Sequence, residues 1–154
     1  MREFPTGGVV VAICKGTDKG GPKRPLDEPV KIKRDFGIPG DAEAEKQSLL
    51  QVKMLPEEGI IAEGGGYAPG ANGENILTRG VDTASIEHGT ILRIGDAGLQ
   101  LTWRADKFQK YRRESGDTKM TDIFATYGVF LTVLKSGCVK IGDRISIIIE
   151  DGVD

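Results

Sequence analysis

The chain has 154 residues, of which 38% are hydrophobic and 29% are charged, so we expect one domain spanning residues 1–154 with a core of its own. The formal net charge of −2 argues against nucleic acid as a partner and against attraction to an anionic membrane. Two cysteines cannot form a disulfide framework, and the apolar run Val9–Cys14 is too short for a membrane span or a secretory signal. We therefore expect a cytoplasmic protein without a membrane partner.

The first third of the chain predicts strands joined by long loops. Apolar and β-branched residues over Gly8–Lys15 predict a buried strand, and the alternation over Pro29–Arg34 predicts a half-buried one. Between them, Gly16–Pro25 is expected to form an exposed loop. Ser48–Leu55 fits either a strand or a helical turn, and a short helix is expected to begin at Pro56.

The middle of the chain predicts a loop, a helical turn and a hairpin. The glycine-rich segment Gly64–Gly70 is expected to be a loop, because adjacent glycines lose too much backbone entropy inside a regular element. Asp82–Ile86 is typical of a capped helical turn. Ile91–Ile94 and Leu99–Trp103 then flank the pair Gly95-Asp96, which is typical of a hairpin turn.

The last third predicts a basic helix over Arg104–Arg113 and two long strands over Tyr127–Leu134 and Val139–Ile149. A second Gly-Asp pair, Gly142-Asp143, also predicts a hairpin turn. Many short strands, long loops and 22 glycines together predict a mainly β protein, a closed or nearly closed antiparallel β-barrel with a few short helices. Closure would also remove exposed strand edges.

Basic residues among glycines form the first candidate site. Lys15, Lys23 and Arg24 lie close to Gly16, Gly20 and Gly21, so cationic tips and backbone N–H groups together suit a phosphate. On motif grounds the same residues favour a solvated loop of mixed charge, since no helix follows as in a phosphate loop.

Carboxylates and an amide form the second candidate site. The side chains of Glu74 and Asn75 could orient a polar ligand, and so could that of Asp41. All three residues also suit turn formation through side-chain hydrogen bonds. A catalyst that uses Asp41, Glu43 or Glu74 as a general base is a further alternative, which needs a strongly perturbed pKa in a pocket.

The basic and aromatic segment Trp103–Arg113 offers an alternative function of another class, a nucleic-acid or protein binding module. Arg104 and Lys107 belong to this segment, in which basic side chains would neutralise phosphates while aromatic rings stack on bases. Asp106 within it, Glu114 directly after it and the negative net charge argue against this reading. The chain has one histidine, His88, and no second ligand at a suitable spacing from it, so we expect no metal site made by the protein alone.

Several motifs together resemble the MOSC domain, named for the C-terminal region of molybdenum cofactor sulfurases, in its small stand-alone bacterial form. They are Glu74-Asn75-Ile76, Gly80-Val81-Asp82, the two Gly-Asp turns and Gly128-Val129-Phe130, with Gly40-Asp41-Ala42 and the loop around Lys23 towards the N-terminus. The resemblance covers nearly the whole chain and implies a barrel like that of pyruvate kinase. It also implies binding of the molybdenum cofactor (molybdopterin) or another phosphorylated ligand, with Lys15, Lys23, Arg24, Asp41, Glu74, Asn75, Arg104 and Lys107 as its candidate contacts.

The resemblance also implies sulfur transfer, for which the required residues are absent. The family cysteine follows the strand that corresponds to Leu99–Thr102, but Trp103–Phe108 contains none, and Glu43 follows the turn after which the family has a histidine. Cys138 is a weak substitute and Cys14 a weaker one, because a reactive thiol needs an accessible, electropositive setting. We therefore expect a degenerate active site without cysteine-based transfer. A partner from molybdenum cofactor biosynthesis or a molybdoenzyme, and an association with pyridoxal phosphate, are implications of the family alone.

Overall fold

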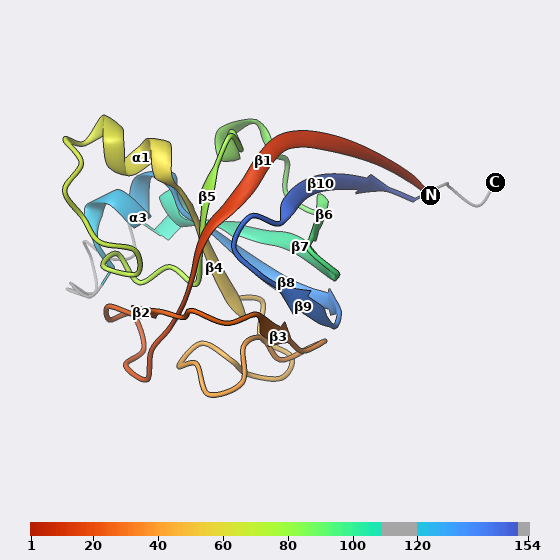
Figure 1. The fold of residues 1–154 in the computed structure, drawn as a ribbon, viewed down its shortest axis with the longest axis horizontal. Coiled ribbons are helices and arrows are strands. Elements are labelled where there is room, and N and C mark those ends of the chain that lie inside the picture. The colour runs from red at the N-terminus through yellow and green to blue at the C-terminus, as the bar shows by residue number, and fades with distance from the viewer. Residues whose placement is uncertain (109–119, 151–154) are drawn as a thin grey trace.

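The computed structural model describes residues 1–108 and 120–150, and within that part of the chain seven strands close into a barrel (Figure 1). The order around it is β10-β6-β7-β8-β4-β5-β1, and β1 pairs with β10 to complete the ring. All neighbours are antiparallel except β4 and β5. The barrel strands are β1 (Arg2–Lys15), β4 (Val52–Pro56), β5 (Ile76–Arg79), β6 (Ile91–Ile94), β7 (Ala97–Arg104), β8 (Val129–Lys135) and β10 (Arg144–Ile149). The predicted mainly β, closed-barrel class is therefore confirmed.

Three short strands lie outside the ring. β2 (Arg24–Pro25) pairs with the end of β1. β3 (Val30–Ile32) and β9 (Gly137–Val139) form a separate two-stranded sheet.

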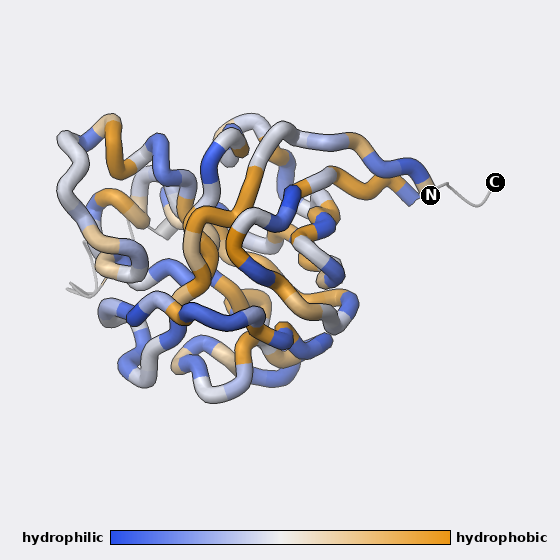
Figure 2. Tube along the Cα trace, in the orientation of Figure 1, coloured by the Kyte–Doolittle hydropathy of each residue, from blue (hydrophilic) through white to orange (hydrophobic). Residues whose placement is uncertain are grey.

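Alternate residues of the barrel strands bury two different clusters, as the two-residue period of a strand requires. On β4, Val52 and Met54 belong to the cluster inside the barrel, whereas Leu55 packs in a second cluster on the outer wall. Lys53 has the same parity as Leu55 and also lies on the outer wall. Figure 2 shows apolar segments gathered where the strands cross and hydrophilic ones towards the loops.

Two short helices cover the outer cluster. They are α1 (Glu57–Ala62) and α3 (Asp122–Tyr127), and Figure 1 shows them on the same side of the barrel. Ile60 and Phe124 bury their side chains there, and the Phe124 ring meets Phe130 of β8 edge-on with 5.5 Å between ring centroids. Thr121 caps α3 by accepting a hydrogen bond from the Phe124 N–H. No helix in the described ranges is long and apolar enough to cross a membrane.

Most of the predicted elements are confirmed, with shifted ends. Val52–Pro56 is a strand, which settles the ambiguity over Ser48–Leu55, and the helix α1 follows Pro56 as expected. The capped turn at Asp82 is η1 (Thr83–Ser85), with the Asp82 carboxylate accepting from the Ala84 N–H. Gly95 has φ +57° in the turn that joins β6 to β7, so the first Gly-Asp hairpin is confirmed.

The second hairpin prediction is wrong. β9 pairs with β3, and β10 pairs with β1 and β6, so Gly142-Asp143 joins two different sheets. The predicted single strand over Val139–Ile149 is correspondingly interrupted. The local turn chemistry was read correctly, since Gly142 has φ +91°, but a turn does not choose the partners of its flanking strands.

Two further differences concern the region after β7. Tyr127, expected at the start of a strand, ends helix α3, because it packs against the outer cluster one helical turn after Ile123 and Phe124. The basic helix predicted over Arg104–Arg113 begins as the 3₁₀ helix η2 (Ala105–Phe108), and its remainder lies outside the described residues.

Candidate functional site

The loop before β2 and the loop before β5 meet on the outer wall of the barrel. The Lys23 N–H donates to the Gly70 carbonyl at 2.8 Å, and the Gly70 N–H donates to Glu74 Oε2 at 2.9 Å. Gly70 has φ +85°, and a Cβ there would lie 2.2 Å from the Lys23 carbonyl oxygen. Only glycine allows so close an approach at this backbone conformation. The structure thus brings the candidates Lys23 and Glu74 together.

A buried ion cluster holds the Lys23 side chain. Its Nζ lies 2.9 Å from Asp41 Oδ1 and also forms a short hydrogen bond to Glu43 Oε2. Asp41 further accepts from the N–H groups of Gly16 and Glu43, each at 3.0 Å. Burial raises the pKa of the Asp41 carboxyl, but these hydrogen bonds and the Lys23 charge outweigh burial, so its pKa lies below the ordinary value. Lys23 is therefore committed to two carboxylates.

Asn75 connects β1 to β4. Its side chain accepts from the Lys53 N–H at 2.9 Å and donates to the Cys14 carbonyl at 3.1 Å. Its backbone donates to the Lys53 carbonyl and accepts from the Cys14 N–H. Four hydrogen bonds to two strands give Asn75 a structural role in continuing the sheet beyond the start of β5.

Lys53 is a cation buried on this outer wall, with 2% of its surface exposed. Its Nζ lies 4.4 Å from the centroid of the Phe124 ring, and among the described residues no side chain pairs with it. Burial lowers the pKa of the Lys53 ammonium, and the Lys23 charge lowers it further; the charges of three carboxylates act in the opposite direction without restoring the ordinary value. These carboxylates are Glu43, Glu74 and Asp41.

Two buried polar atoms in the loop before β5 lack hydrogen-bond partners within the described ranges. They are Glu74 Oε1 and Asn72 Nδ2. Burial raises the pKa of the Glu74 carboxyl despite hydrogen bonds from backbone N–H groups and the nearby Lys53 charge. Since a buried polar atom without a partner is costly, this free acceptor and free donor are the features of the cluster that point to a ligand.

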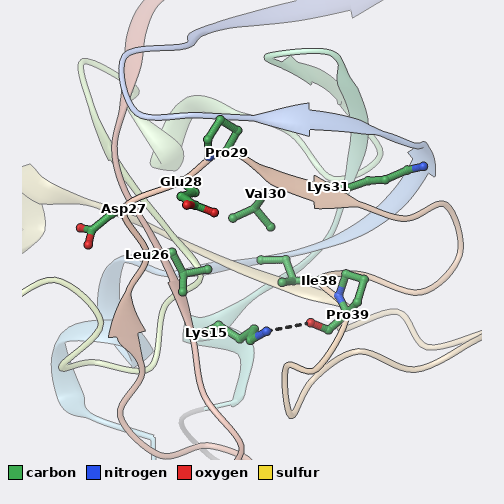
Figure 3. A pocket seen from close by; sticks show the side chains of 9 residues that line it. All are labelled: Lys15, Leu26, Asp27, Glu28, Pro29, Val30, Lys31, Ile38 and Pro39. Atoms are coloured by element: carbon green, nitrogen blue, oxygen red, sulfur yellow. Dashed lines mark hydrogen bonds between the residues drawn. The ribbon is translucent and has the colours of Figure 1, made fainter.

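Lys15 and Arg24 lie on another face. They are directly opposed in the β1–β2 pair, one residue along from Cys14, so their side chains leave the opposite side of the sheet from the outer cluster. Lys15 lines a cavity of about 530 Å³ with apolar residues such as Ile38, and its Nζ donates to the Pro39 carbonyl at 3.3 Å (Figure 3). Lys15, Lys23 and Arg24 therefore do not converge on one point.

The Arg104 side chain forms hydrogen bonds to backbone carbonyls within the protein. Its guanidinium donates to the carbonyls of Thr83 at 2.8 Å, Ala84 at 3.2 Å and Ile86. Lys107 and Arg104 line a cavity of about 320 Å³ beside Tyr127, apart from the cavity next to Lys15. Arg104 thereby ties the end of β7 to η1, which commits its charge within the protein.

The two cysteines occupy different surroundings. Cys14 is buried against the outer cluster, where burial and the Glu74 charge raise the pKa of its thiol to about 12. Cys138 is exposed on β9, in the sheet outside the barrel. A thiolate is favoured in an accessible, electropositive setting. Cys14 is not accessible, and Cys138 does not lie in the outer cluster, so this cluster has no such thiol among the described residues. In the described ranges no group of three His, Cys, Asp or Glu residues is arranged to hold a metal ion.

Sequence reasoning missed Lys53 and Asn72. The signal for Lys53 is its position: a lysine between Val52 and Met54 in an otherwise apolar strand must lie on the opposite face from both. That face is buried only because α3 covers it, which is a tertiary contact. Asn72 gives no comparable local signal.

The fold and this cluster define a class of small, mainly antiparallel closed β-barrels with a polar cluster on the outer wall. The family model of the MOSC domain matches residues 46–146, and the chain belongs to this family. Glu74, Asn75 and Lys53 lie within the matched residues, whereas Lys23 and Asp41 precede them. A comparison with curated proteins found no match.

Solved structures of bacterial proteins share the fold at low sequence identity. The YuaD protein from Bacillus subtilis is 17% identical, with a TM-score of 0.66 over 95% of this chain and 97% of that one. YiiM from Escherichia coli is 18% identical, with a TM-score of 0.59 over 99% of this chain and 73% of that one. YiiM from Geobacillus stearothermophilus is 19% identical, with a TM-score of 0.57 over 96% and 75%. At these identities the similarity concerns the fold.

Proposed function

We propose that this MOSC domain binds a molybdopterin-type ligand of molybdenum cofactor metabolism at the outer cluster and does so without cysteine-based sulfur transfer. The observation that supports it is the pair of buried, unpartnered atoms, Glu74 Oε1 and Asn72 Nδ2. A pterin ring presents N–H donors beside a carbonyl acceptor on one edge, which complements a free acceptor and a free donor. When bound, the cofactor would supply the metal chemistry, while this chain would bind and orient it.

The charges of the cluster favour the ring end of such a ligand over its phosphate. Asp41, Glu43 and Glu74 oppose Lys23 and Lys53, which gives a net charge of −1 if all five are ionised. Lys23 is also saturated by two carboxylates. A dianionic phosphate would therefore be poorly placed among these residues, so the proposal assigns the phosphate to the solvent side.

A ligand can reach the cluster only if a covering segment moves. Glu74 is fully buried, and Lys53 and Asn72 nearly so. Gly64, Gly65 and Gly66 all have positive φ, and a Cβ on any of them would meet nothing within 4 Å. This run gives the loop before β5 both the space and the conformational freedom to open.

The test uses a neutral pterin, 6-hydroxymethylpterin, and its phosphorylated form, with binding measured by calorimetry. Wild type should bind both with similar affinity, and Glu74→Gln should weaken both by about tenfold or more, because the free acceptor becomes a donor. Glu28→Gln, a change of an exposed carboxylate at the other cavity, is the matched control and should bind normally. Absence of binding to wild type would refute the proposal.

A second arm concerns the thiols. The double variant Cys14→Ala, Cys138→Ala should bind the pterin as wild type does, since neither sulfur takes part. Protein purified from a molybdate-supplied host should carry a pterin fluorophore or molybdenum in both forms. Loss of the bound group from the double variant alone would show that a thiol holds it and would overturn this part of the proposal.

A further inference from the structure

Lys53 is placed where an ordinary structural lysine would not be. Its ammonium is buried against the Phe124 ring, with no carboxylate at ion-pair distance in the described ranges. A buried ammonium without a paired anion is destabilised relative to the neutral amine. The neutral amine is the nucleophilic form of lysine.

A proton carrier lies beside it. Glu74 follows Gly73, and a Cβ on Gly73 would lie 3.0 Å from Lys53 Nζ. Glu74 and Lys53 are close enough for each charge to perturb the other. Glu74 Oε1 has no partner within the described residues, so it is free to donate or accept a proton.

We propose that Lys53 is a nucleophilic amine that captures a small neutral aldehyde as an imine, with Glu74 as the proton carrier. The nitrogen lone pair attacks the carbonyl carbon, and the carbonyl π electrons move to oxygen. The C–O bond then breaks as the C=N bond forms. The two protons lost by nitrogen end on that oxygen, which leaves as water, and Glu74 returns to its starting state.

The surroundings select the class of aldehyde. The charged groups facing Lys53 are Lys23, Asp41, Glu43 and Glu74. With Lys53 uncharged, their net charge is −2 if all four are ionised and −1 if Glu74 is protonated. An aldehyde with a carboxylate or phosphate would meet like charges. The free Asn72 Nδ2 donor suits a neutral carbonyl or hydroxyl oxygen.

The inference rests on the proposed function only in that both require the outer cluster to admit a ligand. The experiment treats the folded chain with propionaldehyde and cyanoborohydride near neutral pH and follows each lysine by peptide mass spectrometry. Lys53 should be alkylated at least about tenfold faster than the exposed Lys31, because Glu74 lies beside Lys53 as a proton carrier and Lys31 has none assigned. Glyoxylate, an anionic aldehyde, should lose this preference for Lys53.

Two variants separate mechanism from accessibility. Lys53→Met should lose the fast modification while the other lysines react as before. Glu74→Gln should slow the modification of Lys53 by about tenfold or more and leave Lys31 unchanged, because a positioned acid or base contributes at least this much to proton transfer. Modification of Lys53 no faster than Lys31, or the same rate in Glu74→Gln, would overturn the inference.

The outcomes for the two proposals are distinct. Pterin binding with a slow Lys53 refutes the aldehyde chemistry alone. A fast Lys53 without pterin binding refutes the proposed cofactor role alone.

Discussion

At the residue scale, the outer wall of the barrel contains charges and amides that serve different purposes. Asn75 and Lys23 have their polar atoms committed to neighbouring strands and carboxylates. Glu74 and Asn72 each keep one atom without a partner in the described ranges, and Lys53 contacts aromatic rings without a carboxylate at ion-pair distance there. Since uncommitted buried groups cost stability, we expect the second set to lower the stability of the fold, and the proposed ligand would offset that cost.

Replacement of Lys53 by Met should test this exchange. Met keeps the length of the side chain and packs against Phe124 and Phe130 without a buried charge. We expect the free energy of unfolding to rise by about 0.5–2 kcal/mol in urea denaturation at neutral pH. Lys31→Met, an exposed change, is the control and should alter stability little. A clear loss of stability in Lys53→Met would show that the ammonium is structural.

Replacement of Asn75 by Ala should have the opposite effect. It leaves the buried Lys53 N–H and Cys14 carbonyl without their side-chain partners, so we expect unfolding to require about 2 kcal/mol less. Asn72→Ala is the matched control. It removes one hydrogen bond, which Thr121 Oγ1 donates to Asn72 Oδ1 at 2.6 Å, and an Nδ2 without a partner in the described residues. It should therefore cost less than Asn75→Ala, which removes two, and equal losses in thermal unfolding would contradict the assigned roles.

At the scale of elements, helix α3 buries the outward-facing side chains of β4 and β8. Phe124 lies over Lys53 and against Phe130, so the helix excludes solvent from the cluster. The sharp junction from α3 into β8 at Gly128 holds this ring in place. Gly128 has φ −78°, so its requirement for glycine is a matter of space.

Replacement of Gly128 by Ala should loosen α3. The added Cβ would lie 2.6 Å from atoms of the buried Phe124 ring, so the ring must shift, and we expect a loss of about 1–3 kcal/mol in urea denaturation. The double variant with Phe124→Leu should show a coupling that reduces the summed cost, because the shorter side chain relieves the contact. Strict additivity would place the cause elsewhere.

At the scale of the whole molecule, two carboxyl groups give stability opposite dependences on pH. The pKa of Asp41 is lowered in the fold, so its contribution is present above its unfolded pKa and is lost as pH falls through the folded value. The pKa of Glu74 is raised, so stability is lost as pH rises from the unfolded value of about 4.3 through the folded one.

Glu74→Gln should therefore be more stable than wild type at neutral pH. Its amide cannot ionise, and its carbonyl oxygen can still accept from the Gly70 N–H. The difference should vanish near pH 4 and grow as pH rises above it, in urea denaturation at a series of pH values. A difference that is constant with pH would show that ionisation of Glu74 is not its source.

The sequence by itself determined most of the strands, the first Gly-Asp hairpin, the capped turn at Asp82 and the closed β class, because these depend on the alternation of apolar residues and on local turn chemistry. Its candidate list contained Lys23, Asp41, Glu74 and Asn75, which the fold brings to the outer wall. Only the tertiary structure separated Lys15 and Arg24 from them, paired β9 with β3, and buried Lys53 under α3. Those outcomes depend on which distant strands pair and what covers each face, and the residues that decide this are far apart along the chain.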